Sequence, residues 1–217
     1  MTDFGSALYS ALSGAFVEMN GLTAWEAVAV VLAIAYLWLA MRGSVWCWAA
    51  ALFSTAIYTM LFWEVALLME SVLNVYYMLM AVYGYWLWTR GGDTNGVEVI
   101  SWSLPRHCML IGVTAAISAI VGHLMATYTS ASYPYLDAAT SCFAVVTTYL
   151  VAKKVLENWL YWIVIDFVSI YLYLNKGLML TSMLFILYVG MAIGGYFLWR
   201  TNMRTQSAQE SGHYSYE

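Results

Sequence analysis

An aspartate stands in the middle of a long apolar stretch of the chain. Asp166 is preceded by the run Trp159-Leu-Tyr-Trp-Ile-Val-Ile and followed by Phe-Val-Ser-Ile-Tyr-Leu-Tyr173. In a membrane-spanning helix, its carboxylate would lie about 10 Å along the axis from Trp159, near the centre of the bilayer. An acid at that depth costs at least roughly 2.5–3.5 kcal/mol on insertion scales. A cation, a proton pathway or a structural partner must therefore offset this cost.

Aromatic side chains share the helix face of this acid. Trp159, Trp162 and Tyr173 recur with Asp166 at spacings of three, four and seven residues, which place them on one side of a helix. A buried acid walled by aromatic rings suits an organic cation. The alternative role is structural, with a protonated Asp166 bonded to a Ser, Tyr or Asn of a neighbouring helix. We favour contact with a substrate or an ion.

The composition indicates an integral membrane protein. Of its 217 residues, 63% are hydrophobic and only 9% are charged, and the mean hydropathy is +0.72. Soluble domains carry about 25% charged residues. The chain has no basic stripe typical of nucleic-acid binding and no phosphate-binding loop or metal-ligand spacing. We therefore expect a lipid bilayer around the chain, no nucleic-acid partner, no cofactor and no use of ATP.

Seven apolar runs are long enough to cross a bilayer core of about 30 Å. They lie at 24–41, 45–62, 65–88, 108–127, 136–152, 159–175 and 178–199. The sequence therefore predicts an all-α protein with seven transmembrane helices. Residues 1–23, which lack the basic region of a signal peptide, would form an extracytoplasmic segment, and residues 200–217 a polar cytoplasmic tail.

The basic residues predict the orientation of these helices. Seven of them fall on one side of the membrane, and Lys176 alone falls on the other. Cytoplasmic loops carry the excess of Lys and Arg. The N-terminus should therefore lie outside the cytoplasm and the C-terminus inside. The seven cytoplasmic residues are Arg42, Arg90, Arg106, Lys153, Lys154, Arg200 and Arg204.

The two ends of the chain resemble each other. A shift of 113 residues places Trp46 on Trp159 and Ile57-Tyr58 on Ile170-Tyr171. After a two-residue deletion, Tyr77 falls on Tyr188, and 84–88 falls on 195–199. Residues 24–88 and 136–199 would then form two parallel three-helix bundles, and 108–127 would be a linker helix. Transporters built from parallel repeats bind substrate near the midplane, between the repeats.

Differences between the two halves suggest a single asymmetric ligand. In this alignment Asp166 falls on Phe53, and Asn74 falls on Phe185. Asn74 shares a helix face with Glu70 and Tyr77, and Tyr188 occupies a comparable face in the second half. Asn74 could bind the ligand or make an interhelical hydrogen bond. Glu70 could line a gate or vestibule, or belong to a solvated helix end.

The tryptophans divide into two groups by depth. Trp46, Trp88 and Trp199 stand at the ends of apolar runs, which favours an aromatic belt at the membrane interface. Trp162 lies deeper, and this position favours the wall of a binding site. Tyr and Trp rings can also offer hydrogen-bonding groups to a heterocycle.

Several of these motifs resemble the Pnu vitamin transporters. The resemblance rests on Glu157-Asn-Trp-Leu-Tyr-Trp162 followed by Asp166 and Lys176-Gly177, together with Asn74 and Tyr83-Gly-Tyr-Trp-Leu-Trp88. It covers nearly all of the seven-span region. It implies a SWEET-like 3+1+3 arrangement, a homotrimer, and facilitated diffusion into the cytoplasm of a bacterium, where phosphorylation traps the vitamin. It also implies that the chain is not an enzyme.

The resemblance implies a vitamin as the substrate. Carriers of nicotinamide riboside usually have Asn at the position of Asp166, and the segment 163–173 looks closer to the thiamine branch. Thiamine and nicotinamide riboside are both aromatic cations, so charge alone does not separate them, whereas riboflavin is neutral and larger. We therefore predict an inner-membrane thiamine carrier, with nicotinamide riboside as the alternative substrate.

The resemblance also suggests roles for the candidate residues. Asp166 would face the ring cation, Trp162 and Tyr173 would line its path, and Trp159 would stand nearer a gate. Asn74 and Tyr77 would supply hydrogen bonds from the first bundle. Other possibilities are proton coupling through Asp166 and a membrane sensor that binds a ligand without flux. An intramembrane enzyme is the weakest possibility, because sequence spacing places no second polar group beside Asp166.

Overall fold

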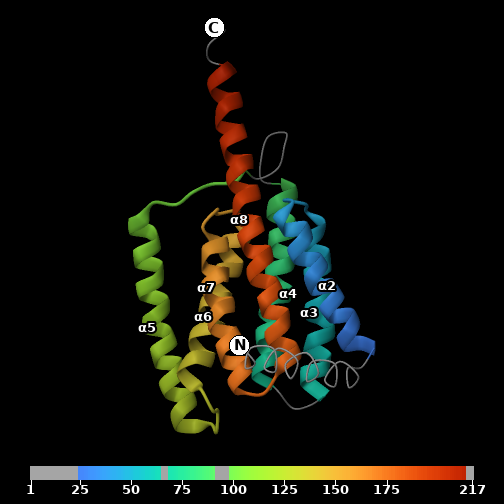
Figure 1. Ribbon diagram of the computed structural model, residues 1–217, viewed down its shortest axis with the longest axis vertical. Helices are drawn as coiled ribbons and strands as arrows, with labels where there is room; N and C mark the ends of the chain where they lie inside the picture. The colour runs from blue at the N-terminus through green and yellow to red at the C-terminus, as the bar shows by residue number, and fades with distance from the viewer. Residues whose placement is uncertain (1–23, 65–67, 91–97, 214–217) are drawn as a thin grey trace, which may run out of the picture.

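The computed structural model describes residues 24–64, 68–90 and 98–213 (Figure 1). Most of the helices begin and end within four residues of the predicted spans. The predicted extracytoplasmic segment 1–23 lies outside the described residues. The helices are α2 (Ala24–Met41), α3 (Trp46–Glu64), α4 (Leu68–Arg90), α5 (Leu104–Tyr128), α6 (Pro134–Ala152), α7 (Asn158–Asn175) and α8 (Met179–His213).

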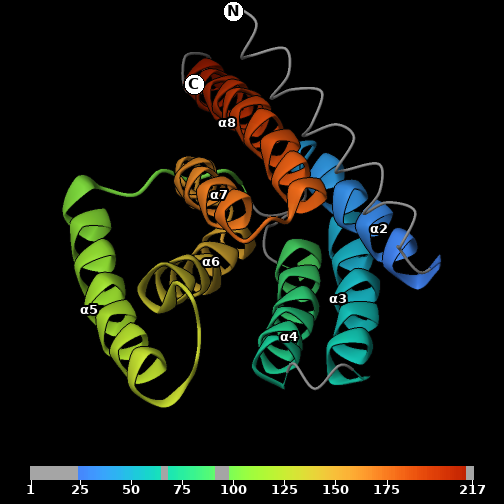
Figure 2. The same cartoon turned by 60° about the horizontal axis from the view of Figure 1, so that its bottom comes forward.

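Six helices form a closed ring. Consecutive helices pack against each other in two rows, α2–α3–α4 and α6–α7–α8, and the rows meet where α4 packs on α6 and α2 packs on α8. Figure 2 shows the two rows with α5 outside the ring, along α6. We call the end with the α2–α3 and α6–α7 turns the basic end, because it carries Arg42, Lys153 and Lys154. The opposite end is the acidic end, where Glu70 and Asp137 lie.

Five of the described helices are long and apolar enough to cross a membrane, namely α2, α3, α5, α6 and the first part of α8. Helices α4 and α7 fall outside that group. The difference follows from their sequences, because α4 contains Glu70 and Asn74 and α7 contains Asp166, besides many Tyr and Trp residues. The two helices that carry the polar candidate residues are therefore the less hydropathic ones.

Helix α8 continues well beyond its predicted end at residue 199. It runs to His213, so residues 200–213, predicted as a polar tail, are helical. Residues 200–211 contain no Gly or Pro to end the helix. Figure 1 shows this extension projecting past the other helices at the basic end.

The internal repeat is visible in the turns that join the helices. Gly43 and Lys154 both have left-handed backbones, with φ of 67° and 50°. The turn hydrogen bonds from Ser44 N to Leu39 O and from Val155 N to Leu150 O are likewise equivalent, each 3.0 Å long. The members of both pairs differ by 111 in residue number. The repeat therefore keeps one offset of 111 from the first turn onward.

This offset corrects the predicted register by two residues in the first part of each half. Trp159 corresponds to Trp48, whereas Trp46 is exposed on the surface. Asp166 corresponds to Thr55, so its predicted match with Phe53 is wrong. The predicted matches of Tyr77 with Tyr188, and of Asn74 with Phe185, already have the spacing of 111. No two-residue deletion is needed, and the aromatic matches at the offset of 113 are coincidental.

Candidate substrate-binding site

Asp166 lies at the middle of α7 and is buried, with 3% of its surface exposed. Helix α7 begins at Asn158, so the carboxylate is roughly 12 Å along the helix from that end. Within the described part of the chain, no residue forms a hydrogen bond or an ion pair with this side chain. A structural role as a bonded, protonated acid would require such a partner. The carboxylate is therefore free to meet a ligand.

Tyr188 lies within electrostatic range of this acid and of a second tyrosine, Tyr58. Tyr188 of α8 has Tyr58 of α3 and Asp166 of α7 as its charged or ionisable neighbours. The three residues come from three helices of the ring and from both rows. Their hydroxyl groups and the carboxylate can offer both donors and acceptors to a polar ligand.

A second aromatic group extends from these residues towards the acidic end. Tyr77 of α4 interacts electrostatically with Tyr173 of α7 and with Tyr36 of α2. The Tyr173 ring stacks on Phe185 with centroids 5.2 Å apart, and Phe185 meets Tyr188 edge to face at 5.5 Å. The structure thus connects the predicted residues Tyr77, Tyr173, Tyr188 and Asp166 through neighbouring rings.

Charged residues form the mouth of this region at the acidic end. Glu70, in the first turn of α4, is exposed, and its electrostatic neighbours are Asp137 and Lys176. Lys176 Nζ lies 2.9 Å from Asp137 Oδ1 in an ion pair that joins the start of α6 to the end of α7. Glu70 also interacts with Tyr77 and Tyr173. This placement suits a vestibule residue better than a side chain that meets the ligand at the midplane.

Asn74 and Trp162 are two further predicted site residues, one on α4 and one on α7. Asn74 is buried, and its Nδ2 donates to Glu70 O of its own helix at 2.9 Å. Its side-chain oxygen has no such bond and can accept one from a ligand. Trp162 is half-buried and packs against the hydrophobic cluster that contains Trp159 and Trp199. It lies one helical turn before Asp166 on α7, so it connects that cluster with the helix face of the acid.

Trp159 belongs to a separate cluster of four tryptophans at the basic end. Its ring meets Trp199 edge to face, with centroids 5.3 Å apart, and only 1% of its surface is exposed. Trp48 meets Trp88 in the same way, at 5.3 Å. The two pairs touch through Trp88 and Trp199 at 6.1 Å. We call these residues the tryptophan cluster; Trp159 is part of it and does not line the region around Asp166.

The predicted aromatic belt is therefore wrong for two of its three members. Trp88 and Trp199 are buried, with 5% and 0% of their surfaces exposed, whereas Trp46 is 66% exposed. Their rings pack on Trp48 and Trp159, and two glycines make room for these partner rings. A Cβ on Gly195 would come within 2.7 Å of Trp159, and a Cβ on Gly84 would clash with Trp48. Without these side chains, the indole rings can lie flat against the neighbouring helices and fill the interior.

Two hydrogen bonds of the tryptophan cluster connect the rows of helices. Trp88 Nε1 of α4 donates to Ala152 O of α6 at 2.9 Å. Trp199 Nε1 of α8 donates to Ala40 O of α2 at 3.0 Å. Each row therefore supplies one donor and one acceptor. We call these two bonds the latch bonds; they hold the rows together at the basic end.

Sequence reasoning missed Tyr36 and Tyr58 as members of the central group. Both are half-buried. Tyr58 is an electrostatic neighbour of Tyr188, and Tyr36 is one of Tyr77 and also lies 6.2 Å from the Trp48 ring. These contacts join different helices, so they depend on helix packing. Within the described residues, no group of three His, Cys, Asp or Glu side chains could hold a metal ion.

The sequence of the chain is similar to those of known proteins. The sequence profile of a family described as "Nicotinamide mononucleotide transporter" matches residues 23–201. The nicotinamide riboside transporter PnuC of Escherichia coli (strain K12) is 21% identical over 188 residues, which cover 75% of this chain and 79% of that protein. The riboflavin/roseoflavin transporter RibM of Streptomyces davaonensis is 25% identical over 202 residues, covering 90% of this chain and 93% of RibM.

The fold is also similar to a solved structure. The crystal structure of the vitamin B3 transporter PnuC superposes with a TM-score of 0.69 at 18% identity, over 91% of this chain and 90% of that one. The predicted relationship to the Pnu transporters is thus confirmed, and members of this family are transporters. This multi-pass helical membrane protein belongs to the nicotinamide mononucleotide transporter family.

Proposed function

We propose that this protein carries a small cationic aromatic vitamin, thiamine in the first place, across the bacterial inner membrane. The observation that carries the proposal is the buried Asp166 carboxylate, which has no hydrogen-bonding or ion-pair partner among the described residues and lies within electrostatic range of Tyr188. A ring cation would supply the missing counter-charge, and the aromatic side chains would stabilise it further by cation–π contact.

In this proposal the candidate residues act along one path. Glu70 receives the cation at the acidic end, and Tyr173 and Tyr77 lead it inwards. Asp166 holds the charged ring, with Trp162 at its side, while Asn74 and Tyr188 offer hydrogen bonds to the polar substituents. Trp159 acts at a distance, because it packs in the tryptophan cluster that closes the opposite end.

The helical arrangement supports a mechanism of alternating access. We propose that α2–α4 and α6–α8 are the two bundles of a 3+1+3 fold and that α5 is the linker, since α5 lies outside the ring. The basic end faces the cytoplasm by the positive-inside rule. The latch bonds would keep this end closed while the acidic end is open, and they would break when the bundles rock around the midplane site.

The transport needs no energy source other than the gradient of the vitamin. We propose facilitated diffusion, with intracellular phosphorylation as the trap, by a homotrimer. Nicotinamide riboside is the second candidate substrate, because the PnuC relative is named for it. It too is an aromatic cation and would use the same carboxylate. Riboflavin, named for the RibM relative, is neutral and would leave Asp166 without a counter-charge.

Counterflow in proteoliposomes tests the proposal directly. The purified protein is reconstituted, the vesicles are loaded with unlabelled vitamin, and uptake of labelled thiamine, nicotinamide riboside or riboflavin is followed without a pH gradient. Rapid exchange of thiamine supports the first candidate, and preferential exchange of nicotinamide riboside supports the second. Exchange that appears only with a pH gradient favours proton coupling. Binding of a vitamin without any exchange would contradict transport and favour a sensor.

A further inference from the structure

A polar pocket lies at the basic end, beside the tryptophan cluster and away from the central group of tyrosines. It has a volume of about 310 Å³, and two cations and two amides are among its lining residues, which include Arg42, Gly43, Lys154, Trp199, Asn202 and Gln206. None of the described residues that line it is Asp or Glu. The described lining therefore combines cations with amide groups and carries no negative charge.

Lys154 is the cation that defines this pocket. Its ammonium lies 4.5 Å from the centroid of the Trp88 ring, and none of the described carboxylates pairs with it. Burial lowers the pKa of Lys154, so an anion placed beside it would stabilise the charged form. The ammonium group is therefore partly buried and makes a cation–π contact with the Trp88 ring.

The backbone of Lys154 indicates that the side chain has a role. Its φ of 50° is left-handed, a conformation that is costly for a residue with a Cβ and is usually given to Gly. At the equivalent turn of the first half, Gly43 takes this conformation. A lysine in place of glycine therefore adds strain that the turn itself does not require, and such strain tends to occur at functional sites.

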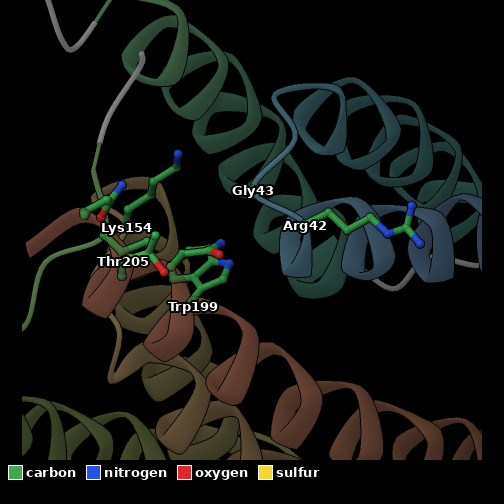
Figure 3. A pocket seen from close by; sticks show the side chains of 8 residues that line it. Arg42, Gly43, Lys154, Trp199 and Thr205 are labelled. Atoms are coloured by element: carbon green, nitrogen blue, oxygen red, sulfur yellow. The ribbon is translucent and has the colours of Figure 1, made fainter. Parts of the chain in front are cut away.

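Two amides of α8 lie next to this lysine. Asn202 and Gln206 are four residues apart and share one face of the helix, and within the described structure neither side chain bonds to another residue. Figure 3 shows Lys154, Thr205 and Trp199 close together, with Arg42 extending away from them. The Arg42 guanidinium lies instead over the Trp38 ring, 4.5 Å from its centroid. The pocket therefore has one ammonium group and two free amides as potential donors.

We propose that this pocket binds a phosphate group at the cytoplasmic face, with Lys154 as its cationic ligand and the amides of Asn202 and Gln206 as donors. A phosphate oxygen accepts several hydrogen bonds at once and prefers charged donors. The group can come from a soluble phosphate monoester, such as a phosphorylated vitamin, or from the headgroup of an anionic lipid. The binding site itself does not depend on the proposed transport function.

The position of the pocket gives binding a consequence for transport. The lining comes from both rows of the ring, with Gly43 in the first half and Lys154 in the second. It also includes Trp199, which makes one latch bond, and Lys154 rests on Trp88, which makes the other. The pocket therefore exists in this form only while the basic end is closed. A ligand that binds one state preferentially shifts the population towards it, so phosphate would slow the opening of this end. This second step rests on the proposed function.

Binding is tested with inorganic phosphate and thiamine monophosphate on the full chain in phosphatidylcholine nanodiscs. The readout is tryptophan fluorescence, with chloride at equal ionic strength as the reference. We expect a saturable change that Lys154→Asn weakens roughly tenfold or more, since a charged hydrogen bond is lost. Asn suits the left-handed turn, so the backbone is kept. Arg106→Gln is the matched control, because Arg106 lies at the same end, at the start of α5, and does not line the pocket; this substitution should change the affinity less than about twofold.

The result that would overturn the site is an absent phosphate response, or an equal response in the wild type and Lys154→Asn. Lys154→Arg, which keeps the charge, should retain binding, and size-exclusion profiles establish that all variants are folded. If nanodiscs with phosphatidylglycerol abolish the response to soluble phosphate, the ligand is a lipid headgroup and feedback by phosphorylated vitamin is excluded. Slower counterflow with phosphate inside the vesicles, absent in Lys154→Asn, would support the effect on opening. Unchanged counterflow with intact binding would refute that effect alone.

Discussion

Replacing Asp166 by Asn separates a ligand-binding acid from a structural one. The substitution keeps the size of the side chain and removes its charge, in a position where 3% of the surface is exposed and none of the described residues is a bonded partner. If the carboxylate serves the fold, Asn should lower the stability of the ligand-free protein. If it serves a cationic substrate, Asn should raise this stability and weaken binding.

The expected magnitudes follow from the position of the side chain. A cation about 4 Å from the carboxylate gains about 4 kcal/mol at an effective dielectric constant near 20. Loss of hydration by the ligand offsets part of this gain, and we expect a net loss of about 2 kcal/mol in Asp166→Asn, or roughly 30-fold in Kd. The ligand-free protein loses an unpaired intramembrane acid, so we expect it to gain about 1 kcal/mol, or about 2–4 °C in Tm for a chain of this length.

The assay combines titration calorimetry of thiamine with thermal unfolding of the detergent-purified protein, with and without the vitamin. Asp137→Asn is the matched control, because it removes a carboxylate whose ion pair with Lys176 is partly exposed and contributes at most about 1 kcal/mol. Equal thiamine affinity in Asp166→Asn and the wild type would refute the charge contact. A fall in the Tm of the ligand-free protein would refute the claim that Asp166 has no structural partner.

Other predictions concern the basic end of the ring. Trp88→Phe and Trp199→Phe each remove one latch bond, which costs about 0.5–1.5 kcal/mol. Each should therefore speed the reaction of a thiol reagent with a cysteine introduced at this end. An increase in only one of the two variants would contradict the symmetry of the latch. Gly195→Ala should destabilise the protein by about 1–3 kcal/mol, because the new methyl group would lie 2.7 Å from the Trp159 ring. Gly190→Ala is the control and should leave the stability unchanged, because nothing lies within 4 Å of its new methyl group. Thermal unfolding compares the two variants. Glu157→Ala removes the carboxylate that accepts bonds from the chain segment before α5 and should speed hydrogen exchange at the start of that helix, and unchanged exchange would show that other contacts hold it.

The sequence predicted the helices well because hydropathy and length dominate in a membrane. Apart from the end of α8, their bounds lie close to the predicted spans, and the turns at the basic end repeat with an offset of 111 residues. The prediction failed at the register of the first part of each half, because Trp46 and Trp48 are both available to match Trp159 and only packing chooses between them. The choice depends on Gly84 and Gly195, whose missing side chains make room for Trp48 and Trp159.

The candidate site was predicted in part for a similar reason. The depth of Asp166 in an apolar run indicated a buried acid, and the structure places it so. Helical periodicity also grouped Trp159 with Asp166. The two residues are about 10 Å apart along the same face of α7, so one end of this face packs in the tryptophan cluster and the other lies at the candidate site. Which residues of other helices approach that face depends on how the ring closes. Tyr58 and Tyr36 could therefore not be identified from spacing along one helix.

The reciprocal arrangement of the latch bonds has a consequence for the origin of the fold. Each half carries an indole donor on its last helix and a carbonyl acceptor at the end of its first helix, both at the basic end. Two identical halves lying parallel would therefore satisfy each other through an isologous contact, in which the same patch serves both partners. A single half could thus already have formed a closed dimer in which four indoles meet edge to face or at a tilt. Joining two such halves in one chain would then have allowed the two copies to differ, as they do at Thr55 and Asp166.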